Sequence, residues 1–232
     1  MSALLRALHQ LSANTPEIKR VFPLQRFKSL FNQGEYADSL YALDEGLVKL
    51  TRVNNVGDRI ILAMCGPGDI VGEEALGGPK STYNADAEVL TVSSGYQIPR
   101  ETLNKLVHQD LEFANMLIDF LLKRRQTLAE KVELLCLHDV EYRILHYLAE
   151  LSSLVRPESD SSGYRVPITQ AELANMIGAT RETTSTTLNQ LEKRGLLKLS
   201  RRLLTIPSPA LLRSAVSSQE NNSLAAAAVK AG

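Results

Sequence analysis

The sequence has few cysteines and no long apolar run, and each absence narrows what the chain can be. Its 232 residues include two cysteines, Cys65 and Cys136, which lie far apart and without CxxC spacing. Such cysteines indicate a reducing compartment, and they cannot supply a four-cysteine zinc or iron–sulfur site. No run of about 18 or more apolar residues occurs, so a transmembrane helix is not expected. We therefore expect a cytoplasmic chain without a membrane partner.

The sequence also has no excess of either charge, since 26 lysines and arginines match 26 aspartates and glutamates. Residues 164–213 depart from this balance, because they carry eight cations and three carboxylates, a net charge of +5. The cations are Arg165, Arg181, Lys193, Arg194, Lys198, Arg201, Arg202 and Arg213. Positive charge concentrated in one segment of a neutral chain is typical of a surface that binds phosphate groups. We expect double-stranded DNA as the partner of this segment.

Two short helices joined by a glycine turn are predicted within this basic segment, over residues 168–195. Thr169 followed by Glu172 forms a capping box that starts the first helix, and Gly178 ends it. Thr180 then caps the second helix. Its inward-facing positions recur at i, i+4 and i+7 and are Thr184, Leu188 and Leu191. This arrangement is typical of a helix-turn-helix.

The outward face of the second helix carries side chains that suit the edges of DNA bases. They are Arg181, Glu182, Ser185, Thr186 and Asn189. Arginine pairs with guanine, glutamate accepts from the cytosine amino group, and asparagine suits adenine. Residues 196–206 then predict a β-hairpin with Arg201 and Arg202 at its tip, a wing that contacts the DNA backbone. We also assign Thr169 to the DNA-contacting residues; an ordinary surface helix hairpin is the alternative for the two helices alone.

The N-terminal part of the chain has a sequence pattern typical of β-strands. Gly34, Gly46, Gly57 and Gly68 recur every eleven or twelve residues, with short strand-like runs between them. Regular turns at this spacing predict an antiparallel sandwich or roll, and the helices that follow residue 100 make the chain an α+β protein.

A long helix is predicted over residues 111–137, with an apolar stripe close to heptad spacing. The stripe consists of Phe113, Met116, Leu117, Phe120, Leu121, Leu128, Val132 and Leu135. Core packing alone could account for it, but a helix of about 25 residues is long to be covered by one small β domain. We therefore predict that these residues form a homodimer interface, which also suits paired reading helices on two DNA half-sites.

Four stretches of the sequence, in this order, resemble the CRP/FNR family of bacterial transcription factors, named after the cyclic-AMP receptor protein and the fumarate–nitrate reduction regulator. They are FNQGEYADSLYALDEGLVKL (31–50), GPGDIVGEEAL (66–76), AEKVELLCLHDVEYRIL (129–145) and ITQAELANMIGATRETTSTTLNQLEKRGLL (168–197). The resemblance covers residues 22–212. It implies a β-roll (jelly-roll-like) sensor domain over 1–110, a dimerisation helix and hinge over 111–138, and a winged helix-turn-helix domain over 139–213. The low-complexity composition of residues 214–232 predicts a flexible tail.

The resemblance also implies roles for single residues on the reading helix. Arg181 would read a guanine, and Glu182 would read the pairing partner of a neighbouring base. The third base-reading position of the family is usually an arginine four residues after that glutamate, and here it is Thr186. Thr186 can contact a thymine methyl group or make no base contact. The implied partners are double-stranded DNA, a second copy of the chain and RNA polymerase.

The sequence identifies the effector less clearly than the DNA-binding residues. In family members that bind cyclic AMP, a Gly-Glu pair holds the ribose, an Arg-Ser pair the phosphate and a Thr-Ser pair the adenine. Gly72 and Glu73 match the first pair, but the phosphate positions fall on Tyr83 and Asn84, and the adenine positions on Leu128 and an alanine. A phosphate needs a cation or several N–H donors, so cyclic AMP is disfavoured, although Lys80 lies close enough in sequence to substitute. A pocket of Gly72, Glu73, Tyr83, Asn84 and Leu128 could instead take a small organic effector.

Other signals stay open at this point. Haem needs an axial ligand, and four histidines could supply one: His9, His108, His138 and His146. Thiol oxidation at Cys65 or Cys136, a cyclic dinucleotide, or no effector at all are further alternatives. A ligand-binding module without DNA function is a different class, which the reading face and basic wing argue against. The sequence has no metal-ligand cluster and no nucleophile with a base, so we expect neither a metal site nor an enzyme.

Overall fold

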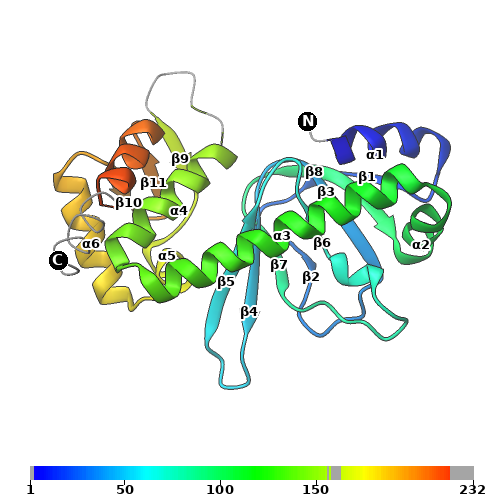
Figure 1. The fold of residues 1–232 in the computed structure, drawn as a ribbon, viewed down its shortest axis with the longest axis horizontal. Helices are drawn as coiled ribbons and strands as arrows, with labels where there is room; N and C mark the ends of the chain where they lie inside the picture. The colour runs from blue at the N-terminus through cyan, green and yellow to red at the C-terminus, as the bar shows by residue number, and fades with distance from the viewer. Residues whose placement is uncertain (1–2, 156, 158–162, 220–232) are drawn as a thin grey trace, which may run out of the picture. The chain divides into compact units, whose positions relative to one another are not determined.

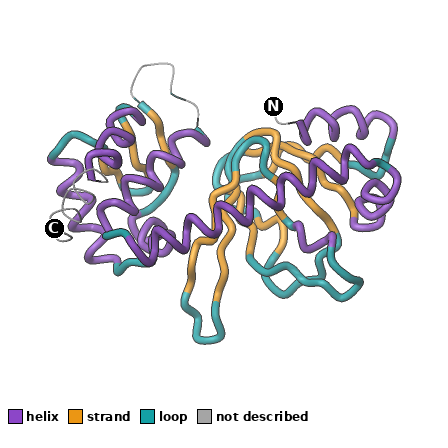
Figure 2. Tube along the Cα trace, in the orientation of Figure 1, coloured by secondary structure: helices purple, strands orange, loops and turns teal. Residues whose placement is uncertain are grey.

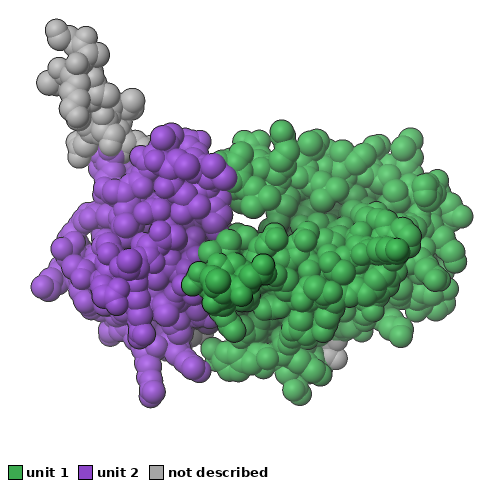
Figure 3. Space-filling view, turned by 90° about the horizontal axis from the view of Figure 1, so that it is seen from below, with its two compact units in different colours: residues 1–130 green, residues 131–232 purple. Residues whose placement is uncertain are grey.

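The computed structural model describes residues 3–155, 157 and 163–219, except the side chain of Phe22. The chain divides into two compact units, residues 1–130 and residues 131–232, drawn in two colours in Figure 3. The first unit is rich in strands and the second in helices, with one long helix contributing to both (Figures 1 and 2). The α+β fold predicted from the sequence is therefore confirmed.

Two four-stranded antiparallel sheets make up most of the first unit. Their strand orders are β1-β8-β3-β6 and β2-β7-β4-β5. The strands are β1 Lys19–Leu24, β2 Ser29–Phe31, β3 Ser39–Glu45, β4 Val48–Val53, β5 Arg59–Cys65, β6 Ile70–Val71, β7 Asp86–Val89 and β8 Ser93–Pro99. Gly46 joins β3 to β4 at a φ of 87°, which favours glycine, and a β-carbon there would collide with Ser93. The glycine turns thus let strands of the two sheets follow each other closely in sequence.

The space between the two sheets is filled by small and medium apolar side chains. Leu43 and Val71 come from one sheet, and Leu50, Val89 and Cys65 come from the other. All five are at most 6% exposed. Because alternate residues of a strand face opposite sides of its sheet, each strand can supply this core while its other side chains face away.

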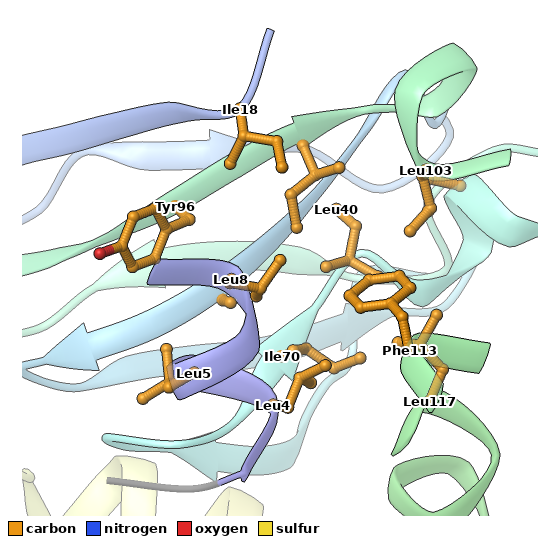
Figure 4. Packing of buried hydrophobic residues seen from close by; sticks show 13 residues of the cluster. Leu4, Leu5, Leu8, Ile18, Leu40, Ile70, Tyr96, Leu103, Phe113 and Leu117 are labelled. Atoms are coloured by element: carbon orange, nitrogen blue, oxygen red, sulfur yellow. The ribbon is translucent and has the colours of Figure 1, made fainter. Parts of the chain in front are cut away.

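A second core cluster joins one of these sheets to the helices of the first unit. These helices are α1 Ala3–Asn14, the 3-10 helix η1 Glu73–Leu76, α2 Arg100–Gln109 and α3 Leu111–Leu137. Leu4, Leu5 and Leu8 form the buried stripe of α1, and Figure 4 shows them in one cluster with Ile70 and Phe113. Burying a leucine completely stabilises a fold by roughly 1.5–3 kcal/mol, so this cluster fixes the start of α3 on the β domain.

The second unit contains a three-helix core and a small sheet. Its elements are α4 Val140–Leu154, β9 Tyr164–Val166, α5 Gln170–Ile177, α6 Arg181–Lys193, β10 Lys198–Ser200 and β11 Leu203–Ile206, with strand order β10-β11-β9. The carboxylate of Asp139 accepts from the backbone N–H of Tyr142 at 2.8 Å and caps the start of α4. This cap marks the break between the end of α3 and the start of α4.

The segment expected to be a flexible tail, residues 214–232, begins within a helix. Residues 209–219 are helical. Leu212 is fully buried, and the side chain of Gln219 donates to Glu141 at 2.9 Å, so both ends of this stretch are held by the domain. Residues 214–219 thus belong to a helix, and the expected flexibility of the tail stays a prediction; residues 220–232 lie outside the described part of the chain.

Candidate nucleic-acid interface

The first helix of the predicted pair starts and ends where the sequence places it. The hydroxyl of Thr169 accepts from the backbone N–H of Glu172 at 3.1 Å, and the Glu172 carboxylate accepts from the backbone N–H of Thr169 at 2.9 Å. Gly178 ends α5 in the left-handed region at a φ of 63°. Such a turn residue lets the chain reverse direction at low steric cost, so α6 can follow immediately.

The inward stripe of α6 is confirmed by burial. Thr184, Leu188 and Leu191 are all completely buried. The hydroxyl of Thr184 donates to the backbone carbonyl of Thr180 at 2.8 Å, which satisfies a polar group that would otherwise be costly to bury. This stripe fixes which face of α6 points toward solvent.

The outward face of α6 presents the predicted base-reading residues. Arg181, Glu182, Thr186 and Asn189 are exposed, and Ser185 is half-buried. Thr180 caps the helix directly before them, with its hydroxyl accepting from the backbone N–H of Thr183 at 3.2 Å. The face therefore begins at the helix N-terminus, where the residues of a reading helix contact base edges.

The predicted wing is a β-hairpin beside the reading helix. Ser200 pairs with Leu203 across β10 and β11, so Arg201 and Arg202 form a two-residue turn, and both are exposed. The Glu192 carboxylate of α6 accepts from the backbone N–H of Leu199 at 2.7 Å. This hydrogen bond ties the wing to the reading helix, and the two arginines can meet DNA phosphates from that position.

Thr169 has a structural role that the sequence assignment did not give it. Its hydroxyl donates to the Glu172 carboxylate at 2.8 Å while it accepts from the Glu172 backbone. The hydroxyl hydrogen and one of the two acceptor lone pairs of the side chain are thus used within the capping box. The residue serves to start α5, and its expected contact with DNA stays a prediction.

The apolar stripe of α3 divides into two groups with different surroundings. Phe113 and Leu117 are at most 3% exposed and lie in the core of the chain's own β domain. Met116 and Phe120 are partly buried against the same cluster. The prediction that Phe113 and Leu117 face a partner was therefore wrong, because α1 and the sheet already cover them.

The remaining predicted interface residues are exposed and line up with one more apolar side chain. Leu121, Leu128, Val132 and Leu135 are 37–59% exposed, and Ile118 is 52% exposed. With Arg125 they form the series 118, 121, 125, 128, 132 and 135, in steps of three and four residues. Such steps are the a and d positions of a heptad repeat. Ile118 was missed, although strict alternation of these steps in the sequence would have identified it.

The candidate effector pocket is occupied by a side chain of the protein itself. Tyr83 is 3% exposed, and its ring stacks on Phe31 at 3.8 Å between centroids. Its hydroxyl donates to the backbone carbonyl of Ser39 at 2.7 Å and accepts from the Ser39 N–H at 3.1 Å. A β-carbon on Gly72 would lie 3.0 Å from the Tyr83 ring, so the two residues pack in direct contact. Tyr83 is a core residue, which corrects its assignment to the lining of a pocket.

The other residues assigned to the pocket do not converge on an open site. Asn84 is exposed, and its backbone N–H donates to the Glu74 carboxylate at 3.2 Å. Leu128 is 47% exposed on α3. Glu73 is held by Arg124 of α3, with 3.9 Å between the charged groups. Burial raises the pKa of the Glu73 carboxyl, and the positive charge of Arg124 opposes part of that shift.

The two cysteines differ sharply in their surroundings. Cys65 is completely buried, and burial raises the pKa of its thiol to about 12, although the nearby Arg124 guanidinium opposes the shift. The Nη1 atom of Arg124 lies 3.7 Å from the Cys65 sulfur. Cys136 is exposed near the end of α3. Since thiolates are the reactive form, Cys65 is poorly suited to the redox role that the sequence left open.

His9 and His146 have partners within the protein, and no histidine of the described residues belongs to a metal-binding cluster. Within that part of the chain, no group of three or more histidine, cysteine, aspartate or glutamate side chains could hold a metal ion. His9 hydrogen bonds with the hydroxyl of Tyr96 at 2.8 Å, and His146 lies 3.7 Å from the Glu150 carboxylate. In the same residues, no helix combines the length and apolar character needed to cross a membrane.

Comparison with known proteins gives matches to both units. Residues 22–110 match the cyclic nucleotide-binding domain, and residues 142–215 match the Crp-like helix-turn-helix domain. The fumarate nitrate reduction regulatory protein of Klebsiella oxytoca is 27% identical over 205 residues, which cover 88% of this chain and 81% of that protein.

Solved structures agree with these matches. A CRP-family transcriptional regulator from Thermus thermophilus is 26% identical, with a TM-score of 0.71, over 86% of this chain and 96% of that one. The c-di-GMP-responsive global regulator CLP of Xanthomonas campestris has the same fold, with a TM-score of 0.69 and 24% identity, over 85% of this chain and 98% of that one.

Proposed function

Because the chain belongs to the CRP/FNR family of transcriptional regulators, we propose that it binds palindromic promoter sites as a homodimer. The observation that carries this proposal is the outward face of α6, where Arg181 and Glu182 are exposed beside a basic wing. Relatives of this chain are regulators, and we infer that it has no catalytic activity of its own. Its place of action would be the cytoplasm, with RNA polymerase as a further partner.

Different parts of the interface would perform different tasks on DNA. Arg181 would donate two hydrogen bonds to a guanine, and Glu182 would accept from a cytosine amino group. Thr186 is too short to reach a guanine as arginine does, so its base pair would be read weakly, through a thymine methyl group at most. Arg201 and Arg202 would bind phosphates and fix the register of the domain without reading sequence.

The exposed seam of α3 would bring two copies together. Five apolar side chains and Arg125 follow heptad spacing along the solvent-exposed part of this helix. Isolated helix faces of this kind are stabilised when a second helix covers them, and a parallel pair aligns identical positions. Two reading helices would then lie on half-sites one helical turn apart, about 34–36 Å.

A signal at the β-roll domain would control the regulator, and cyclic AMP does not suit this chain. The place of the phosphate-binding arginine is taken by Tyr83, whose hydroxyl already hydrogen bonds to Ser39. Arg124 instead pairs with Glu73, the residue that would hold the ribose. The effector, if the chain has one, must therefore act by contacts that leave this packed region or rearrange it.

Selection from a library of random DNA duplexes tests the proposal directly. Rounds of binding to the full chain should enrich an inverted repeat whose half-sites are about 10 base pairs apart, with two chains bound per duplex. Specific binding should exceed binding to unselected duplexes by at least about 10³-fold at fixed salt. Failure to enrich any sequence, or enrichment without inverted symmetry, would contradict the proposed mode of binding.

A further inference from the structure

The reading helix is contacted at both ends by residues from the junction between α3 and α4. Before α6 begins, a β-carbon on Gly178 would lie only 2.9 Å from the Cδ2 atom of Leu135, so the backbone of the turn packs directly on that methyl group. After α6 ends, the Nη1 atom of Arg194 lies 2.6 Å from the Glu141 carboxylate. Leu135 is near the end of α3 and Glu141 is in the first turn of α4.

We propose that Leu135 and Glu141 are positioning residues that hold the two ends of the reading helix, and we call their contacts with Gly178 and Arg194 the bracket. The two residues lie on either side of the break between α3 and α4, which Asp139 caps. A change of angle at this break moves one contact relative to the other. The bracket converts that movement into a change in the orientation of α6. This inference rests on the proposed function, because it assigns a route by which the reading face is oriented.

The Glu141 carboxylate makes a further hydrogen bond besides its ion pair with Arg194. The same carboxylate oxygen accepts from Arg194 at 2.6 Å and from the side-chain amide of Gln219 at 2.9 Å. The first donor follows the reading helix, and the second lies in the helical stretch at residues 209–219. Glu141 is 25% exposed, so the contact is partly shielded from water. One carboxylate thus joins three segments that are far apart in sequence, which a paired surface charge alone does not do.

The neighbouring geometry explains why the orientation of α6 depends on its two ends. Along its length the helix is packed through the side chains of Thr184, Leu188 and Leu191, which form a single narrow stripe. Packing of side-chain ridges into grooves allows interaxial angles that scatter by about 15–20°, so it leaves some freedom of rotation and tilt. Contacts at the preceding turn and the following residue restrain both of these motions. Base reading depends on the rotation and tilt of α6, because hydrogen bonds to base edges are lost when donor and acceptor are displaced by more than a small distance.

The variant Glu141→Gln tests the bracket, with Glu150→Gln as the matched control. Both changes remove one negative charge from α4, but Glu150 is exposed and lies 3.7 Å from His146 of the same helix. Three quantities are measured on the full chain at one salt concentration. They are the Kd for a duplex selected by the wild-type protein, the Kd for an unselected duplex of equal length, and amide hydrogen exchange of residues 186–199 without DNA.

The bracket predicts weaker binding to the selected duplex without weaker binding to the unselected one. Glu141→Gln should weaken binding to the selected duplex about three- to fivefold, the range expected for loss of a partly exposed ion pair. Binding to the unselected duplex should stay equal or become tighter, because a negative charge has been lost. Exchange over residues 186–199 should be faster. Glu150→Gln should leave the selected Kd and the exchange unchanged, and Glu141→Arg combined with Arg194→Glu should restore at least half of the lost affinity.

Two results would overturn the inference, and a third would overturn the proposed function. Equal behaviour of the Glu141→Gln and Glu150→Gln variants in both measurements shows that the bracket does not hold α6. Faster exchange with an unchanged selected Kd shows that Glu141 stabilises the domain without positioning the reading face. If the wild-type chain selects no sequence, the proposed function fails, and exchange in the free protein still decides whether Glu141 holds the end of the helix.

Discussion

The two units differ in whether the side chains at their family motif positions are exposed or buried. In the second unit, Arg181 and Glu182 stand exposed on α6, above a stripe that is completely buried. In the first unit, Tyr83 turns inward, stacks on Phe31 and hydrogen bonds to Ser39. A motif position on an exposed face stays accessible to a partner, whereas one that lies next to a core can become part of that core.

The difference follows from what each side chain must satisfy. An exposed arginine is hydrated until DNA binds, so the fold places few demands on it. A tyrosine beside a glycine and a phenylalanine gains from burying its ring, provided that its hydroxyl finds partners. The backbone of Ser39 provides both a donor and an acceptor. The chemistry of the reading face can therefore change with little effect on folding, while that of the β-roll position cannot.

The largest contrast is expected in thiol chemistry, and it bears on whether the first unit senses oxidants. At pH 8 a thiol reagent should modify Cys136 at least about 10³-fold faster than Cys65, since burial raises the pKa of Cys65 to about 12 while Cys136 is exposed. The native state holds the Cys65 proton more tightly than the unfolded chain. Stability from this group is therefore complete below about pH 8.5 and is lost as the pH rises toward 12. Equal labelling rates in the folded protein would revive the redox alternative.

The next effect concerns whether the two cores are separate. Leu188 is completely buried in the second unit, so Leu188→Ala should lower the free energy of unfolding of that unit by about 2–5 kcal/mol. Leu43→Ala is the matched change between the sheets of the first unit. Calorimetry should show each variant shifting a different transition. One common transition, shifted equally by both variants, would mean that the two units unfold together and that their cores are not independent.

On the reading face, one substitution should change specificity without changing stability. Arg181→Ala should weaken binding to the selected duplex by about 1–3 kcal/mol and relax the preference at one base pair. Arg202→Ala in the wing is the control, because it should weaken all sequences alike and reduce the salt dependence. Titrations with a panel of single-base variants of the duplex measure both. If Arg181→Ala weakens all sequences equally, this residue binds phosphate and the assigned reading role is wrong.

The reading helix could be predicted from sequence because its signals are local. The capping pair Thr169 and Glu172, the turn at Gly178 and the buried stripe of α6 all act within a few residues of each other. Such patterns depend on helix geometry alone. The wing followed similarly, since two short apolar runs around a pair of arginines form a hairpin without help from distant parts of the chain.

The partners of the apolar stripe of α3 and the surroundings of Tyr83 could not be predicted in the same way. Periodicity showed that α3 has an apolar stripe, but which residues meet the chain's own sheet depends on where α1 packs. Phe113 was therefore assigned to the partner, and Ile118 was overlooked. Counting along the chain assigned Tyr83 to a pocket, but the direction of its side chain depends on Phe31 and Ser39, which are 52 and 44 residues away. Long-range packing of this kind produces no periodic pattern in the sequence.

The seam of α3 provides a test in which a gain is expected. Arg125 occupies a heptad position between Leu121 and Leu128, and a polar residue there fixes register at a cost in stability. Arg125→Leu should therefore tighten the dimer by about tenfold, as measured by sedimentation equilibrium. Lys123→Leu makes the same change of charge and shape outside the seam, and its dimer affinity should stay at the wild-type value. An unchanged or weaker Arg125→Leu dimer would place the interface elsewhere.

The smallest effect is expected at Tyr83, where the comparison began. Tyr83→Phe keeps the ring stacked on Phe31 but leaves the buried N–H and carbonyl of Ser39 without the hydroxyl, which should cost about 1 kcal/mol of unfolding free energy. Tyr36→Phe is the control, because Tyr36 is 51% exposed and its loss of a hydroxyl should change stability by less than about 0.5 kcal/mol.

Cyclic AMP added to either protein should leave the melting temperature unchanged, since removal of one hydroxyl creates no cation for the phosphate. A ligand that binds the native state and not the unfolded chain raises the melting temperature by an amount that grows with the logarithm of its concentration divided by its Kd, so a large shift in the wild type would show that Tyr83 moves aside. The first unit would then resemble the second in keeping its motif position accessible, and the contrast between them would describe only the ligand-free chain.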